Sequence, residues 1–158
     1  MAGHEYRARV HWERGGAIFT DNRYSRGHSW QFDAGVVVPA SSSPYTVRVP
    51  LSVEAAVDPE EALVAALSSC HMLWFLDLAA KDGWCVDDYR DDARGLMGRD
   101  AAGRIAILQV TLRPRVLFAG VRRPERLAHE ALHHRAHESC FIANSVKTAV
   151  SVELPADA

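Results

Sequence analysis

The chain has 158 residues and a net charge of −2, with 48% apolar and 24% charged residues. These are the proportions of an ordinary globular protein, and the length suits a single domain over residues 1–158. Lysine and arginine are scattered and the net charge is small, so no global field favours binding to nucleic acid or to an anionic membrane.

The first part of the chain is expected to form β-strands. Alternating residue character predicts strands at 6–12 and 28–33, with a turn at Gly15-Gly16 and a return strand at 17–20 between them. The region is expected to continue with β character at 36–38, a loop at 40–44 and irregular or short-stranded chain at 45–57.

A long helix is predicted next, over residues 59–81. Asp58 is a good N-cap, Pro59 suits the first helical position, and Glu61 stands where a capping box needs a carboxylate. Gly83 is expected to end the helix. This start is the most strongly specified local feature of the chain.

The apolar part of this helix, residues 62–80, approaches the length of a membrane span. Four polar residues interrupt it, and no other segment could span a membrane with it. We therefore predict a buried helix in the core of a soluble protein. The interrupting residues are Ser68, Ser69, His71 and Asp77.

The second half of the chain predicts a hairpin, a helix and a strand. Two long strands, 86–99 and 104–118, are joined through the turn 100–103, and Pro114 indicates a sheet edge or a bulge. An amphipathic helix is expected over 124–139, with Leu127, Ala131 and Leu132 on one side, and a strand over 146–154. Grouped strands and helices of this kind predict an α+β fold.

The three cysteines differ in their surroundings. Residues 1–9 lack the apolar core of a signal peptide, so we expect a cytoplasmic, reducing setting in which cysteines are free, catalytic or metal-bound. Cys85 is expected to be a packed core residue. Cys70 lies in a polar island with Ser68, Ser69 and His71, which predicts a local polar site. Cys140 ends a helix beside a loop, where a thiol can move toward a partner sulfur.

Several motifs together resemble those of the OsmC/Ohr family of thiol peroxidases. They are Asp58-Pro59-Glu60-Glu61, Ser68-Ser69-Cys70-His71-Met72, Glu138-Ser139-Cys140-Phe141-Ile142-Ala143-Asn144-Ser145, Tyr24-Ser25-Arg26-Gly27-His28 and Phe32-Asp33-Ala34-Gly35. The resemblance covers nearly the whole chain. It implies an antiparallel sheet wrapped around the long central helix, and an intertwined homodimer.

The resemblance also implies roles for particular residues. Cys70 matches the peroxidatic cysteine, Cys140 the resolving cysteine, Glu60 the family glutamate and Arg26 the family arginine, with Arg23 as its rival. A guanidinium would stabilise the Cys70 thiolate, and a paired carboxylate would hold that guanidinium in place. The implied substrate is an organic hydroperoxide, facing apolar walls such as Leu73, Trp74 and Phe141. No bound cofactor is implied, because a dithiol such as a lipoyl group resets the cysteines.

The spacing of two of these residues bears on the dimer. Glu60 and Cys70 are ten residues apart, so on one helix they are separated by about 15 Å along its axis. A common site would then take Glu60 from a partner subunit. By itself, Glu60 is better explained as a favourable charge at a helix N-terminus.

Two other classes of function stay open from the residues alone. His129, His133 and His137 recur every four residues, and with Cys140 they could bind zinc, although neither CxxC nor HExxH is present. The second class is a non-catalytic redox sensor or a small-ligand module that uses apolar side chains such as Met72, Trp74 and Phe75. Repeated turnover with a dithiol would distinguish a peroxidase from a sensor.

Overall fold

The computed structural model describes residues 3–156. The chain forms two compact units that meet within one helix, the first ending at Ala62 and the second starting at Leu63. The two helices and several antiparallel strand pairs confirm the α+β class. That the chain is a single domain stays a prediction.

The first unit holds a three-stranded antiparallel sheet in the order β1-β2-β3. Its strands are β1 (Ala8–His11), β2 (His28–Phe32) and β3 (Val37–Ala40). The return strand predicted at 17–20 is wrong, because β1 pairs directly with β2, Ala8 opposite Phe32. The intervening loop is held by its own aromatic side chains instead: the rings of Phe19 and Tyr24 stack with centroids 4.8 Å apart.

Helix α1 (Pro59–Lys81) has the predicted limits and the predicted start. The N–H of Glu61 donates to Asp58 Oδ1 at 2.8 Å, and the N–H of Asp58 donates to Glu61 Oε2 at 3.3 Å, which is the reciprocal pattern of a capping box. Gly83 follows the helix with φ of 78°, a left-handed conformation that suits a helix end.

The burial of α1 follows one stripe rather than the whole circumference. Leu67, His71, Phe75 and Ala79, spaced every four residues, are the buried positions, whereas Leu73 is 62% exposed. The helix is long and apolar enough to cross a membrane. Its buried stripe, however, packs into the apolar cores of the second unit, so α1 is a core helix.

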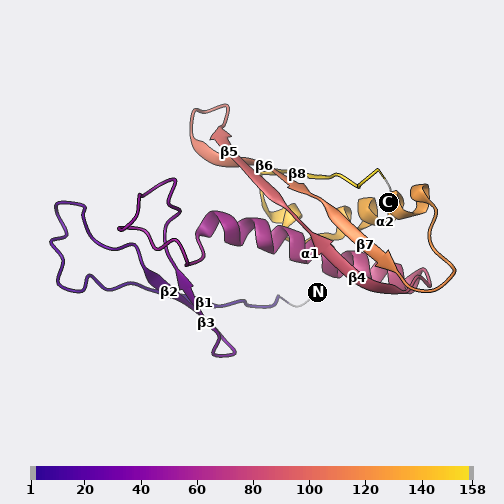
Figure 1. Ribbon diagram of the computed structural model, residues 1–158, viewed down its shortest axis with the longest axis horizontal. Coiled ribbons are helices and arrows are strands. Elements are labelled where there is room, and N and C mark those ends of the chain that lie inside the picture. Colours follow the sequence, from indigo (N-terminus) through magenta and orange to yellow (C-terminus); the bar gives the residue numbers. More distant parts are fainter. Residues whose placement is uncertain (1–2, 157–158) are drawn as a thin grey trace. The chain divides into compact units, whose positions relative to one another are not determined.

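Both predicted long strands are divided in two. β4 (Val86–Asp91) pairs with β7 (Pro114–Phe118), and β5 (Arg94–Arg99) pairs with β6 (Ile105–Leu112). Figure 1 shows the two pairs following one another as one long ribbon. The predicted turn at 100–103 is confirmed, with Gly103 at φ of 79° and its N–H donating to the Asp100 carbonyl.

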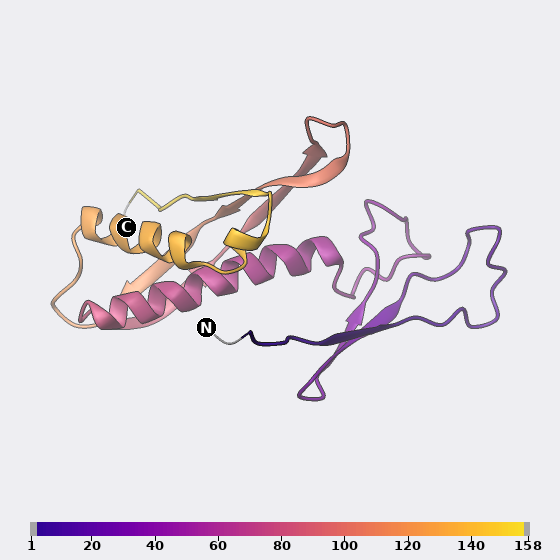
Figure 2. The same ribbon diagram turned by 180° about the vertical axis from the view of Figure 1, so that it is seen from behind.

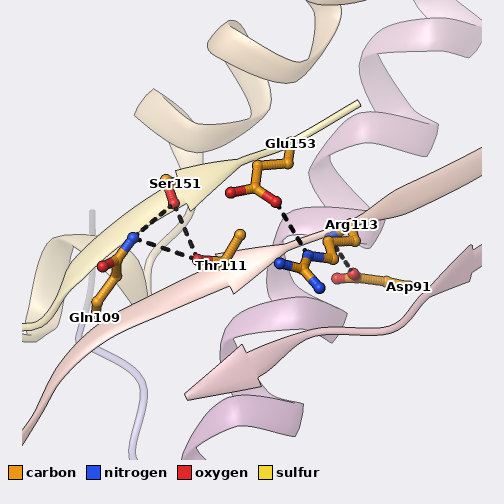
Figure 3. Close-up of polar contacts among 6 residues, drawn as sticks. All are labelled: Asp91, Gln109, Thr111, Arg113, Ser151 and Glu153. Atoms are coloured by element: carbon orange, nitrogen blue, oxygen red, sulfur yellow. Dashed lines mark hydrogen bonds and ion pairs between the residues drawn. The ribbon is translucent and has the colours of Figure 1, made fainter. Parts of the chain in front are cut away.

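Asp91 fixes the division between the two strand pairs. One of its carboxylate oxygens accepts the backbone N–H of Arg113 at 2.6 Å, and the other accepts the Ser68 hydroxyl of α1 at 2.5 Å. Arg113 in turn donates from Nε to Glu153 at 3.1 Å (Figure 3). The Pro114 that follows has no N–H for a ladder, which accounts for the break at this point.

Helix α2 (Arg126–Ser139), a 3₁₀ turn (Ala143–Ser145) and β8 (Ala149–Val152) complete the second unit. β8 lies parallel to β6, and the Gln109, Thr111 and Ser151 side chains link the two strands (Figure 3). The predicted apolar face of α2 is partly wrong. Leu127 is 79% exposed and Ala131 is exposed, while the buried face consists of His129, Leu132, His133 and Ala136.

Two apolar clusters form the interior of the second unit. The first joins α1, α2 and the β4–β7 pair through Phe75, Ala79, Phe118, Leu132 and Ala136. The second joins α1 to β6 through Leu67, Val110 and Leu112. The segments that carry Cys70 and Cys140 are therefore anchored to a common core.

Candidate functional site

The structure brings the side chains of Cys70 and Cys140 close to one another. Cys140 is the C-cap of α2 and is 1% exposed, whereas Cys70 on α1 is partly exposed. The backbone N–H of Ala143 donates to the Cys140 sulfur at 3.4 Å. Burial raises the pKa of the Cys140 thiol, the Ala143 N–H opposes this rise, and the neighbouring Cys70 thiol raises the pKa further.

The polar island around Cys70 is divided among separate partners. The Ser68 hydroxyl donates to Asp91, the His71 ring bonds to the His133 ring, and Ser69 is exposed. The residues of this island therefore do not form one polar site, although the sequence predicted one. Around the helix, Cys70 is the member of the island that meets the other thiol.

Apolar side chains flank the thiols in sequence. The rings of Trp74 and Phe141 meet edge to face with centroids 5.2 Å apart, one from α1 and one from the residue after Cys140. Phe141 is 61% exposed, so this aromatic pair presents apolar surface next to the second cysteine.

Arg26 and Glu60 lie in the first unit. The Arg26 guanidinium stacks on the Tyr24 ring at 3.9 Å, donates to the Asn22 side chain at 2.8 Å and also donates to the Tyr24 carbonyl. Glu60 is in the first turn of α1 and is partly buried. Among residues 3–156, the ion pairs do not include one between Arg26 and Glu60. The rival Arg23 is exposed.

A chain of buried imidazoles links α1 to α2. His71 Nε2 lies 3.0 Å from His133 Nδ1, and His133 Nε2 lies 3.2 Å from His129 Nε2. Burial, followed by the neighbouring His137, lowers the pKa of His71 to about 4. Burial, followed by the neighbouring histidines, lowers the pKa of His133 to about 3. These rings are neutral at physiological pH.

These contacts bear on the metal-binding alternative. His129 and His133 direct ring nitrogens at one another and at His71 instead of around a common centre. In the described chain, no group of three His, Cys, Asp or Glu side chains is placed to hold a metal ion. Two of these histidines are buried in the core, His129 at 4% and His133 at 2% exposure.

Sequence reasoning missed this imidazole chain and misplaced one cysteine. The signal for the chain was present: His129 and His133 are one turn apart and alternate with Leu132 and Ala136 on the same face. Cys85, expected in the core, is exposed.

An open pocket of about 430 Å³ lies between α2 and the C-terminal strand region. Its lining combines charged and imidazole side chains with an aliphatic floor. The lining residues are Arg126, Glu130, His133, His134, His137, Val150, Val152 and Leu154.

Comparisons with known proteins agree on one family. The family model described as OsmC-like protein matches residues 52–155. An OsmC-like protein of unknown function from Vibrio cholerae is 52% identical, with a TM-score of 0.95, over 97% of this chain and 100% of that chain. Among curated proteins, none matches the chain.

More distant structures share the fold. The organic hydroperoxide resistance protein OhrB of Bacillus subtilis is 17% identical, with a TM-score of 0.69, over 96% of this chain and 98% of that chain. An organic hydroperoxide resistance protein OsmC from Legionella pneumophila is 15% identical, with a TM-score of 0.65, over 98% and 97% of the two chains. Similarity at this level of identity establishes the architecture.

Proposed function

Because the chain belongs to the OsmC-like protein family, we propose that it is a cysteine-based peroxidase that reduces organic hydroperoxides to alcohols. The observation that carries the proposal is the contact between the Cys70 and Cys140 side chains inside one subunit. Organic hydroperoxide resistance proteins share this fold, which adds support for the substrate class.

In the proposed reaction, Cys70 is the nucleophile. Its thiolate attacks one peroxide oxygen, the O–O bond breaks, and the departing alkoxide takes a proton to leave as the alcohol. Cys70 is then a sulfenic acid. The Cys140 thiolate attacks the Cys70 sulfur, the S–O bond breaks, and water leaves as the disulfide forms. A dithiol supplies two electrons and two protons to restore both thiols.

The environments of the two thiols support this division of roles. Cys70 is partly exposed, so a peroxide can reach it, whereas Cys140 is 1% exposed and has a raised pKa. A buried, protonated thiol is a poor first nucleophile toward peroxide. Its position against Cys70 suits it to the second, intramolecular step.

We also propose that the active form is a homodimer, in which Arg26 and Glu60 of a partner subunit complete the site. Within residues 63–156, no lysine or arginine side chain hydrogen-bonds to either thiol. Cys70 is eleven residues beyond the start of α1, too far for the helix N-terminus to stabilise a thiolate. A guanidinium held by a carboxylate would supply the missing stabilisation.

The apolar pair of Trp74 and Phe141, in which Phe141 is 61% exposed, favours an organic hydroperoxide over hydrogen peroxide as substrate. The proposal places the protein in the cytoplasm, with no bound cofactor and with a small or lipoyl dithiol as reductant. Free cysteines in a reducing compartment are consistent with that location.

Steady-state turnover tests the proposal. Wild type is expected to reduce cumene hydroperoxide repeatedly with dihydrolipoamide, and Cys70→Ser is expected to lose this activity. Cys85→Ser, which removes the exposed third cysteine, is the matched control and is expected to keep full activity. Undiminished activity in Cys70→Ser would overturn the mechanism, and a single oxidation without turnover would indicate a redox sensor.

A further inference from the structure

The imidazole chain joins the two helices that carry the thiols. His71 directly follows Cys70 on α1, and His133 precedes Cys140 on α2 by seven residues, or about two helical turns. Both views of the fold show α1 and α2 alongside one another (Figures 1 and 2). The His71–His133 hydrogen bond links the two helices, is 3.0 Å long and is shielded from solvent.

The rings are held firmly in the apolar core. His71 and His133 are parallel to within 2°, and the Phe75 ring stacks on His133 with centroids 4.3 Å apart. His129 meets Phe118 edge to face at 5.3 Å. Little freedom remains for any of the three imidazoles to turn away from its neighbour.

The hydrogen-bond pattern fixes where the protons lie. A neutral imidazole carries one N–H, so the three rings can donate in only one of two directions. His71 Nδ1 is buried and has no hydrogen-bond partner among residues 3–156. An unpaired buried N–H is less tolerable than an unpaired lone pair. We therefore assign donation from His71 to His133 and from His133 to His129.

An additional proton on any of the three linked imidazoles would break the hydrogen-bond pattern between them. If His133 were protonated, its Nδ1–H would point at the Nε2–H of His71. The His71 proton could move to Nδ1 to avoid this clash, but the Nδ1–H would then be buried without a partner. Among residues 3–156, the ion pairs of histidine are those of His11 and His134, both exposed, so no carboxylate pairs with the three buried rings.

The other polar groups around the three imidazoles do not supply a carboxylate partner for a protonated ring. Tyr89 of β4 has a buried hydroxyl without a partner, and Asp91 acts on Tyr89. Charge on His137 of α2 would act on His71 and lower its pKa further, after the larger effect of burial. Glu130 and Arg126 act on His129 with opposite effects on its pKa, which burial lowers.

We propose that the His71–His133–His129 chain is a positioning device, which holds α2 against α1 so that the Cys140 thiol meets Cys70, and which works only while all three rings are neutral. This inference rests on the proposed role of the two cysteines as a disulfide-forming pair. The rings touch neither substrate nor reacting sulfur, so they act through the placement of Cys140. Protonation of these imidazoles is expected to move the Cys140 thiol away from the Cys70 thiol.

The test measures how readily the two thiols pair without any peroxide. In a Cys85→Ser background, diamide oxidises the protein, and the Cys70–Cys140 disulfide is equilibrated with dithiothreitol from pH 7 to pH 3.5, a range that reaches the lowered pKa values of His71 and His133. While all thiols are protonated, exchange between the protein disulfide and dithiothreitol consumes and releases no net proton. The equilibrium constant of a cysteine pair that no titrating group positions is therefore independent of pH. Maleimide labelling of the remaining thiols reports the disulfide fraction, and circular dichroism confirms that the fold is retained.

Wild type is expected to lose disulfide stability by about tenfold on acidification, whereas His133→Phe is expected to be about tenfold weaker at pH 7 and independent of pH. His71→Gln retains an N–H donor toward His133 and is expected to stay within about threefold of wild type at pH 7. His134→Gln, on the exposed side of the same helix, is the control and is expected to match wild type throughout.

A flat pH profile in wild type would overturn the inference, even if His133→Phe fails to fold. Equal disulfide stability in wild type and folded His133→Phe would also overturn it. Because diamide replaces peroxide, a protein with no peroxidase activity can still show the predicted profile, and the positioning role then stands while the proposed enzyme fails. Failure of diamide to link the two cysteines would overturn both.

Discussion

Acidification from pH 8 to pH 5 is expected to destabilise the fold through the buried histidines. His71 and His133 have pKa values lowered from 6.5 to about 4 and about 3, because burial penalises the charged ring. In the unfolded chain both rings regain ordinary values and bind protons below pH 6.5. The unfolded state therefore binds more protons, so stability is full above pH 6.5 and is lost as the pH falls toward the folded values.

The size of the expected loss in the free energy of unfolding follows from these lowered pKa values. At pH 5 an ordinary histidine is almost fully protonated while the buried rings stay neutral, which costs about 2 kcal/mol for each ring. The two rings together are expected to lower the free energy of unfolding by about 4 kcal/mol. His129 shifts in the same direction and adds to the loss.

Urea unfolding at fixed protein concentration, followed by tryptophan fluorescence at a series of pH values, measures this loss. His133→Phe keeps the aromatic stack on Phe75 and removes one titrating group, so the drop between pH 8 and pH 5 should shrink by about 2 kcal/mol. His134→Gln removes an exposed histidine of the same helix and should leave the drop unchanged. The same drop in His133→Phe and wild type would refute the reasoning.

Three further substitutions test the packing that positions the site, each by urea unfolding at pH 8. Asp58→Ala removes the α1 cap and should cost about 1 kcal/mol, whereas Asp58→Asn should retain most of the stability; equal losses would count against the capping role. Phe75→Ala empties the centre of the first apolar cluster and should cost about 3–5 kcal/mol, so a loss below about 1 kcal/mol would contradict its place there. Asp91→Ala leaves the Arg113 N–H without its acceptor and should cost about 1–3 kcal/mol, whereas the exposed Asp87→Ala should change little.

Local signals in the sequence predicted both ends of α1 and the turn at 100–103 well. The start of α1 is set by residues adjacent in the chain, Asp58 and Glu61, and both capping hydrogen bonds are present. The turn at 100–103 and the end of α1 at Gly83 depend on backbone conformations that glycine adopts readily. In these places the physical cause lies within a few residues of its effect.

The errors arose where distant contacts decide the structure. The division between the β4–β7 and β5–β6 pairs depends on hydrogen bonds of Asp91 with Ser68 and Arg113, which are far from Asp91 in the sequence. The buried face of α2 was misread because histidine was counted as polar, although His129 and His133 satisfy one another in the core. Hydrophobic periodicity alone cannot detect a polar group that is buried with its own partner.

The candidate site divides in the same way. Cys70 and Cys140 could be identified from their motifs, and the packing of α1 against α2 brings their thiols together. The partner arginine and glutamate could not be fixed by sequence, since their proposed role depends on a second subunit.

The fate of Cys70 after one equivalent of cumene hydroperoxide, measured by mass spectrometry of peptides, is the most direct test of its role as nucleophile. Wild type should give the Cys70–Cys140 disulfide, and Cys140→Ser should give a Cys70 sulfenic acid that dimedone traps. Dimedone on Cys85 in place of Cys70, or unmodified Cys70 in both proteins, would contradict the assignment of Cys70 as the peroxide-reducing thiol.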